Sequence, residues 1–301
     1  MQLSKTDLLL LTDNAIAAAF QAGEVISQYM QQSVEVHSKI AGDSHASQVV
    51  TEVDIKCQQI IETILLADCK IFDLAFLTEE SVDDKKRLEK DYFWCVDPLD
   101  GTLPFIEKSS GYAVSIALVS QSGIPVIGVI YDPLEQTLYH AIYGEGAFRN
   151  GKKWKYKNVI APNKHHLTIV SDRSFIQQDY YHSIILALGT IADKLDYIGL
   201  KLIHHGGAAM NACWVLENSP AVYFKFPKQQ DGGGSLWDYA ASACLFNEIG
   251  AVVSDIHGQT LNLNRAQSSF MNHAGIIYSC SQDLSQEISQ IYNNYLQAQA
   301  I

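Results

Sequence analysis

The sequence predicts a fold that mixes helices and strands, of the α+β or α/β class, and three observations support this prediction. Residues 5–32 place apolar side chains at helical spacing. Residues 112–153 contain short apolar runs separated by turn signals, which is typical of antiparallel strands. From about residue 167, strand-like and helix-like segments alternate, which indicates an α/β arrangement.

The first half of the chain is expected to begin with two helices and to continue as a sheet. The helices should cover residues 5–32 and a stretch that begins near residue 51. Strands are expected within 71–78, at Phe93–Val96, at 111–120 and at 124–131. A further hairpin should turn at Asn150-Gly151, because this dipeptide favours the tight turns of hairpins.

The second half is expected to form a separate domain. The polar stretch "NVIAPNKHH" contains a proline, so we place a boundary there, between residues 1–161 and residues 162–301. The expected elements are strand 167–171, helix 176–188, strand 200–204, helix 207–217, strand 221–224 and helix 238–249. Gly250 should close the last helix.

Composition excludes several classes of partner. The chain has 301 residues and a formal charge of −12, and its densest basic stretch is only Lys85-Lys86-Arg87, so no nucleic acid polymer is expected to bind. No apolar run is long enough to cross a bilayer, and "MQLSKTDLLLLTDNA" does not have the pattern of a signal peptide. Six scattered cysteines without a C-x-x-C pair predict reduced thiols and a cytoplasmic protein.

The stretch "WCVDPLDGTLPF" places two carboxylates, Asp97 and Asp100, directly after a predicted buried strand. Pro98 should end this strand, and Asp100 should precede a new helix that begins at Gly101-Thr102. The unpaired N–H groups of a helix start favour an anion, whereas carboxylates favour a cation. Each aspartate alone would be interpreted as a turn or capping residue. Together they suggest a phosphate bridged by metal ions.

Two other acidic residues could complete such a site. Glu79 follows a predicted strand in "TEES", and Asp238 opens a predicted helix in "LWDYAAS". Mg²⁺ prefers hard oxygen ligands and usually combines one or two carboxylates with water and a substrate phosphate. We therefore expect Glu79 and Asp238 to converge on Asp97 and Asp100.

These motifs resemble those of the inositol monophosphatase family. The matching segments are "DPLDGT" preceded by Trp94, "TEES", "WDYAA", "VVTEVD" and "YGEGAFRNGK". The family includes inositol monophosphatases, CysQ-type 3′(2′),5′-bisphosphate nucleotidases and relatives of fructose-1,6-bisphosphatase. The resemblance implies a layered αβαβα sandwich of the sugar-phosphatase type. It also implies a Mg²⁺-dependent, Li⁺-sensitive hydrolase of small phosphate monoesters, and it is compatible with a homodimer.

The resemblance assigns roles to individual residues. The expected ligands of two or three Mg²⁺ ions are the carboxylates of Glu79, Asp97, Asp100 and Asp238 and the carbonyl of Leu99. The catalytic group is Glu79 with Thr102 and Asp54, of which the last two should position the attacking water and take its proton. The amides of Gly101 and Thr102 should hold the phosphate.

The substrate contacts that the resemblance implies are Ser171, Gly206, Gly207, Lys225 and Asp238. Inositol monophosphatases have a glutamate for sugar hydroxyls at the position that matches Lys225. A cation there suits a second phosphate, as in 3′-phosphoadenosine 5′-phosphate, although Lys225 could equally be a solvated lysine. Inositol monophosphate and the phosphonucleotide both remain open as substrates.

Two alternatives belong to other classes. Haloacid-dehalogenase-type phosphatases use Asp-x-Asp-Gly-Thr, in which the aspartates are two apart, whereas Asp97 and Asp100 are three apart. A degenerate member that only binds phosphate or nucleotide is the non-catalytic alternative. The full set of predicted metal ligands favours an enzyme.

Overall fold

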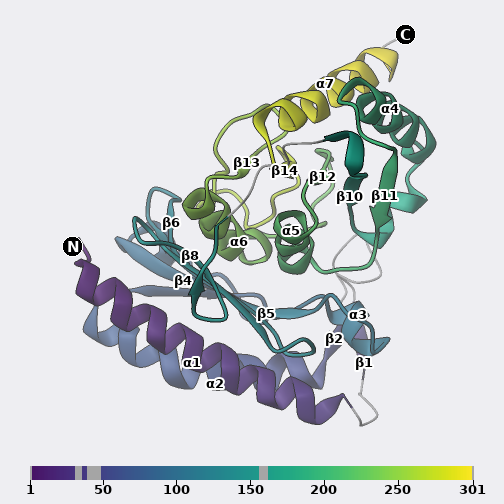
Figure 1. Ribbon diagram of the computed structural model, residues 1–301. Coiled ribbons are helices and arrows are strands. Elements are labelled where there is room, and N and C mark those ends of the chain that lie inside the picture. The colour runs from purple at the N-terminus through teal and green to yellow at the C-terminus, as the bar shows by residue number, and fades with distance from the viewer. Residues whose placement is uncertain (1, 31–35, 39–48, 156–161, 300–301) are drawn as a thin grey trace.

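The computed structural model describes residues 2–30, 36–38, 49–155 and 162–299 (Figure 1). The helices are α1 (Lys5–Tyr29), α2 (Glu52–Ile71), α3 (Thr102–Ile106), α4 (Tyr181–Lys194), α5 (Ala208–Glu217), α6 (Leu236–Ile249) and α7 (Gln282–Gln299). None of the helices in these described ranges is both long enough and apolar enough to span a bilayer.

A seven-stranded sheet forms the first half of the molecule. Its order is β3-β4-β5-β6-β7-β8-β9, with β3 and β4 parallel and the other neighbours antiparallel. The strands are β3 (Ala75–Thr78), β4 (Tyr92–Asp100), β5 (Ala113–Ser120), β6 (Pro125–Asp132), β7 (Thr137–Ile142), β8 (Gly146–Arg149) and β9 (Lys152–Lys153). The expected hairpin turns at Asn150 and Gly151, both of which have positive φ, as this type of turn requires.

Helices α1 and α2 cover one face of this sheet (Figure 1). The N-terminus of α1 is fixed by a capping box, in which Ser4 and Asp7 bond to each other's backbone N–H groups. The helix buries a stripe of alanines, such as Ala15 and Ala22, that permits close packing against α2 and the sheet. A short pair, β1 (Val36–Ser38) and β2 (Val49–Thr51), precedes α2.

A five-stranded sheet of order β11-β10-β12-β14-β13 forms the second half. Its strands are β10 (Leu167–Val170), β11 (Leu200–Ile203), β12 (Ala221–Lys225), β13 (Val252–Ser254) and β14 (Ile276–Ser279). Helices α4 and α7 pack on its outer face, while α5 and α6 lie between the two sheets (Figure 1). The sequence of layers is therefore helices, sheet, helices, sheet, helices, which confirms the αβαβα sandwich.

The middle layer approaches the first sheet closely. A Cβ atom added at Gly128 in β6 would lie 2.3 Å from the carbonyl oxygen of Ala241 in α6. Only glycine permits this separation between strand and helix. One core cluster includes side chains of both sheets together with α5 and α6, so the two halves share buried apolar surface.

The two sheets lie on either side of the boundary that the sequence suggests. The first sheet falls within residues 75–153 and the second within residues 167–279. The positions 156–161 before the boundary lie outside the described residues. The division into domains of residues 1–161 and 162–301 therefore stays a prediction.

Several expected element boundaries were wrong. Pro98 does not end its strand, because β4 continues through an irregularity to Asp100. Helix α4 begins at Tyr181 rather than near residue 176, since residues 173–177 form a tighter 3-10 turn, η4 (Arg173–Gln177). Helix α6 begins at Leu236, and Ser235 rather than Asp238 is its N-cap.

Candidate active site

The irregularity in β4 brings Asp97 and Asp100 to one place. In a regular strand, residues three apart point to opposite faces of the sheet. Here the pairing of β4 with β5 shifts between Asp97 and Asp100, at the position of Pro98, which has no N–H for the ladder. The bulge turns both carboxylates toward the same side. Asp97 also accepts a hydrogen bond from the backbone N–H of Leu99 at 3.0 Å, which fixes its orientation.

Helix α6 contributes the third carboxylate from its first turn. Ser235 and Asp238 form a capping box, and the Ser235 N–H donates to Asp238 Oδ2 at 2.5 Å. Ser235 is itself held by a β-bridge to Phe270. Because α6 packs on the face of the first sheet beside β4, the start of this helix delivers Asp238 to the end of that strand.

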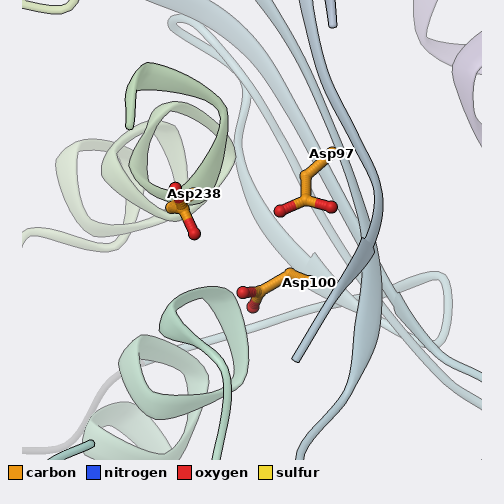
Figure 2. Close-up of side chains that lie close together, drawn as sticks. All are labelled: Asp97, Asp100 and Asp238. Carbon is orange, nitrogen blue, oxygen red and sulfur yellow. The ribbon is translucent and has the colours of Figure 1, made fainter. Parts of the chain in front are cut away.

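The carboxylates of Asp97, Asp100 and Asp238 point toward one another across the gap between β4 and α6 (Figure 2). Each offers an oxygen atom, and these atoms all lie within 4.8 Å of one another. Oxygens on opposite sides of a Mg²⁺ ion with bonds of about 2.1 Å lie about 4.2 Å apart. The three side chains therefore need only a small adjustment to share a hard divalent cation, and the donor set fits Mg²⁺.

Electrostatics supports the same interpretation. Burial, followed by the charges of Glu79, Asp100 and Asp238, raises the pKa of Asp97 well above its usual range. Burial and Asp238 raise the pKa of Asp100. Burial and Glu79 raise the pKa of Asp238 to about 7, against the opposing charge of Lys225. Carboxyl groups that repel one another in a buried site are stabilised when a cation binds between them.

Asp100 also joins the two halves of the molecule. Its carboxylate oxygens accept hydrogen bonds from the backbone N–H groups of Ala208 at 3.0 Å and Ala209 at 2.7 Å. These are the first two residues of α5, so Asp100 caps a helix that belongs to the second half of the chain. The hydrogen bonds from these N–H groups oppose the rise in the pKa of Asp100, although burial and the charge of Asp238 still raise it overall.

A cavity of about 790 Å³ surrounds the cluster, a size that suits a small-molecule ligand. Ten of the predicted site residues line it: Glu79, Asp97, Leu99, Asp100, Gly101, Thr102, Gly206, Gly207, Lys225 and Asp238. The Thr102 hydroxyl donates to the carbonyl of Leu99 at 3.3 Å. Glu79 directly follows β3, which lies beside β4, so the two neighbouring strand ends supply Glu79 and Asp97.

Two predicted site residues do not line this cavity. Ser171 is buried, and its hydroxyl lies 2.6 Å from Nδ1 of His204, which does not line the cavity either. Asp54 is buried in the first turn of α2, and its charge contributes to the raised pKa of Asp97. Asp54 is therefore close to the cluster, although it is not part of the cavity wall.

Lys225 lines the cavity, but it is neither a solvated lysine nor a cation without a partner. Its ammonium lies 2.5 Å from Oδ2 of Asp172 and donates to the carbonyl of Gly233 at 2.7 Å. Burial alone would lower the pKa of Lys225, but the charge and the hydrogen bond of Asp172, with the charge of Asp238, outweigh burial and raise it. The ammonium is thus held as a cation by its partners.

Asp172 also lines the cavity, although it is not among the site residues predicted from the sequence. Its position was marked by polar residues after the apolar strand β10, in "VSDRSF". Ser171 was predicted from the family resemblance of this segment, and the polar residues after the strand are a further signal that could have identified Asp172.

Comparisons with known proteins identify the family of this chain. The sequence profile described as the inositol monophosphatase family matches residues 7–296. The chain is similar to inositol monophosphatase 2 of Solanum lycopersicum, with 30% identity over 263 residues, 86% of this chain and 92% of the relative. It is also 28% identical over 247 residues to the Nus factor SuhB of Escherichia coli K12, covering 81% of this chain and 84% of the relative.

A solved structure supports the fold. The inositol monophosphatase of Thermotoga maritima superposes with a TM-score of 0.72 at 21% identity, over 95% of this chain and 98% of the other. The profile match spans nearly the whole chain and includes every carboxylate of the cluster. The chain belongs to the inositol monophosphatase family.

Proposed function

We propose that this protein is a Mg²⁺-dependent phosphomonoesterase that hydrolyses a small phosphate monoester by attack of water. Membership of the family supports a phosphatase. The convergence of Asp97, Asp100 and Asp238 within 4.8 Å is the observation that supports metal dependence most strongly. The proposed substrates are inositol monophosphate or a 3′-phosphoadenosine 5′-phosphate-type compound.

Different residues of the cavity are proposed to bind the metal ions and to orient the phosphate. Asp97, Asp100 and Asp238, with Glu79 and the Leu99 carbonyl, would hold the metal ions. When bound, these ions would supply Lewis-acid activation of water and neutralise the phosphoryl oxygens. The N–H groups of Gly101 and Thr102 would orient the phosphate.

The proton of the attacking water requires a base. Thr102 and Asp54 are proposed to orient the water and to take this proton. Thr102 lines the cavity, and the charge of Asp54 raises the pKa of Asp97, which supports their assignment to this role. No covalent bond from the protein to phosphorus is required in this scheme.

The alternatives receive less support. A haloacid-dehalogenase-type reaction needs a nucleophilic aspartate two residues before a second aspartate, and Asp97 precedes Asp100 by three. Trapping of an acyl phosphate on Asp97 during turnover would favour that alternative. A non-catalytic role would leave a cluster of mutually repelling buried carboxylates without a purpose.

The remaining proposals concern the setting of the enzyme. All six cysteines lie in the described part of the chain and none of them forms a disulfide there, which suits a reducing compartment such as the cytoplasm. Inhibition by Li⁺ and assembly as a homodimer are proposed from the family alone.

Release of inorganic phosphate tests the proposal. The panel consists of inositol 1-phosphate, 3′-phosphoadenosine 5′-phosphate, fructose 1,6-bisphosphate and the aryl ester 4-nitrophenyl phosphate, each with Mg²⁺ and with EDTA. We expect hydrolysis of at least one ester with Mg²⁺ and none with EDTA. Full activity in EDTA, or no activity on the whole panel with Mg²⁺, would overturn the proposed function.

Two neighbouring glutamates provide a matched pair of variants. Glu79 lines the cavity, whereas its half-buried neighbour Glu80 is not among the described lining residues. Changes beside a metal ligand cost about 10–100-fold, so Glu79→Gln, which alters a ligand itself, should cost at least about 100-fold in kcat/KM. Glu80→Gln should stay within about threefold of the wild type. Equal losses in both variants would remove the assigned role of Glu79.

A further inference from the structure

Gln58 is a buried amide one helical turn after Asp54. Both residues lie on α2, four positions apart, so their side chains leave the same face of the helix. Gln58 is only 8% exposed. A glutamine is rarely buried to this extent unless its amide group has hydrogen-bond partners, so the partners of Gln58 show which part of the molecule it holds.

The side chain of Gln58 holds the residues on both sides of Glu79. Its oxygen accepts hydrogen bonds from the Thr78 hydroxyl at 2.7 Å and from the backbone N–H of Glu80 at 3.2 Å. Its nitrogen donates to the Ser81 hydroxyl at 2.9 Å. The residue directly before Glu79 and the two residues directly after it are therefore tied to one amide group.

The amide of Gln58 uses all of its hydrogen-bonding capacity. Both lone pairs of its oxygen accept, and its second N–H donates to the Glu62 carboxylate at 3.1 Å. Turning the amide over would set its N–H groups against the N–H of Glu80 and its oxygen against the Glu62 carboxylate. The partners therefore fix the amide in one orientation.

The backbone of Glu79 is also tied to the strand that carries Asp97. The Glu79 N–H donates to the Val96 carbonyl at 3.2 Å, and Thr78 is the partner of Val96 in the ladder of β3 and β4. Asp97 is the next residue of β4. The position of Glu79 relative to Asp97 therefore depends both on this backbone pairing and on the hydrogen bonds from α2.

Glu79 depends on such support more than the three aspartates do. Among the described residues, the group whose oxygens lie within 4.8 Å of one another consists of Asp97, Asp100 and Asp238, and Glu79 lines the same cavity outside that group. A glutamate side chain has one more rotatable bond than an aspartate. The path of the backbone around Glu79 therefore decides whether its carboxylate reaches a cation that the aspartates bind.

A separate anchor holds the chain beyond Glu79. Arg87 is buried, and its guanidinium donates to Asp83 Oδ2 at 2.9 Å and to Asn264 Oδ1 at 2.6 Å. This anchor does not involve α2. A change at Gln58 should therefore act on the turn around Glu79 and leave the rest of the segment in place.

We propose that Gln58 is a positioning residue of the metal site, which orients the Glu79 carboxylate by holding the residues on both sides of it. This inference rests on the proposed function, in which Glu79 is a metal ligand. A ligand that neighbouring hydrogen bonds hold in place binds its metal more tightly, and loss of such a partner costs about 10–100-fold in metal affinity. Because Asp54 lies one turn earlier, α2 supplies both the proposed base and the support of Glu79.

Binding of Mn²⁺ without substrate tests this proposal, because Mn²⁺ takes the same oxygen ligands as Mg²⁺. The electron paramagnetic resonance signal of free Mn²⁺ falls as the ion binds, so a titration gives a Kd that does not depend on turnover. Gln58→Met keeps the length of the side chain but removes its amide, and its Kd should rise by about tenfold or more. Gln59→Met, the same change at the exposed neighbour, should stay within about twofold of the wild type.

A double variant shows whether Gln58 acts through Glu79. Adding Gln58→Met to Glu79→Gln should change the Kd by less than about threefold, because the carboxylate that Gln58 orients is already gone. Gln58→Glu returns an oxygen that accepts from Thr78 and Glu80, and its Kd should be within about threefold of the wild type. A tenfold loss from Gln58→Met that is equally large with and without Glu79 would overturn the inference.

A gentler variant keeps the test decisive if Gln58→Met does not fold, which circular dichroism in EDTA shows. Thr78→Val has nearly the same shape as the wild-type side chain and removes only the 2.7 Å hydrogen bond to Gln58. Its Kd for Mn²⁺ should rise by about threefold or more. An unchanged Kd in Thr78→Val would then count against the role of Gln58.

The outcomes separate this inference from the proposed function. A wild type that binds Mn²⁺ and hydrolyses a phosphate monoester, together with a folded Gln58→Met that binds Mn²⁺ equally well, would refute the role of Gln58 and leave the phosphatase intact. A wild type that binds no Mn²⁺ and shows no Mg²⁺-dependent hydrolysis would refute both.

Discussion

Replacing Asp238 by asparagine is expected to stabilise the metal-free protein progressively as the pH rises from 5 to 8. Burial and Glu79 raise the pKa of this carboxyl from its ordinary value of 3.8 to about 7 in the folded protein. Between these values, the folded wild type holds a proton that the unfolded chain has lost. The free energy of unfolding of the wild type therefore falls as the pH rises through this window. Asparagine does not titrate, so the variant avoids this loss.

The size of the effect follows from the shift. From pH 5 to the folded pKa of about 7 is two pH units, and each unit lowers the free energy of unfolding of the wild type by about 1.36 kcal/mol. The loss of stability that the variant avoids is therefore at most about 2.7 kcal/mol. Asp238 is partly exposed, and screening reduces this value, so we expect about 1–2 kcal/mol. A chain of 301 residues unfolds with an entropy of about 0.6 kcal/mol/K, which converts this energy into a difference of about 2–3 °C in Tm.

The comparison with the variant is needed because the histidines change the stability of the folded state with pH in the opposite direction to Asp238. Burial lowers the pKa of four histidines, so they favour the folded state increasingly as the pH rises toward 6.5. The wild type and Asp238→Asn both contain these histidines, so the histidine contribution to stability cancels in the difference between their Tm values. Asparagine also keeps an oxygen that can accept from the Ser235 N–H, so the cap of α6 is preserved.

Thermal unfolding followed by circular dichroism in EDTA measures this difference at pH 5, 6, 7 and 8. Saturating Mg²⁺ at pH 8 should then raise the Tm of the wild type more than that of the variant, because ligand binding stabilises only the state that binds it. Parallel Tm curves for the two proteins in EDTA, or a variant that loses stability relative to the wild type as the pH rises, would refute the reasoning.

Three further predictions concern single residues. Asp97→Asn should lower kcat/KM by at least about 100-fold while the far-UV circular dichroism is unchanged, and a variant with more than a tenth of wild-type activity would contradict its role as a metal ligand. Gly128→Ala should lower the free energy of unfolding in urea by about 2–3 kcal/mol, because the new Cβ would lie 2.3 Å from the Ala241 carbonyl oxygen. Its control is Gly189→Ala inside α4, where the space is open and the free energy of unfolding should rise by up to about 1 kcal/mol. Ser235→Ala should cost about 1 kcal/mol through loss of the α6 cap, and an unchanged midpoint would contradict that role.

Local patterns predicted much of the fold. Strands β5 and β6 were recognisable because they are apolar and joined by a Gln-Ser-Gly turn, and Asn150-Gly151 located the β8–β9 hairpin. Helix α7 was not predicted, since it is rich in Gln, Asn and Ser and buries only a narrow apolar stripe that includes Leu284, Ile288 and Ile291. Its partners, α4 and the second sheet, are distant in sequence, and only the tertiary structure shows them.

For the site too, the sequence predicts the residues but not the way in which they come together. The sequence identified Asp97, Asp100 and Asp238, and the structure brings them together. The way they meet was not predictable, because a bulge at Pro98 and a cap at Ser235 decide it. Asp172 was missed because its importance arises from Lys225, which is 53 positions away in the chain and adjacent only through the pairing of β10 with β12.

Anomalous diffraction from crystals grown with Mn²⁺, which takes the same oxygen ligands as Mg²⁺, tests the central claim most directly. We expect anomalous peaks between the carboxylates of Asp97, Asp100 and Asp238, at bonding distance from their oxygens, and no peaks there in Asp97→Asn crystals. Mn²⁺ bound only elsewhere on the protein, with these three carboxylates empty at saturating metal, would contradict the account.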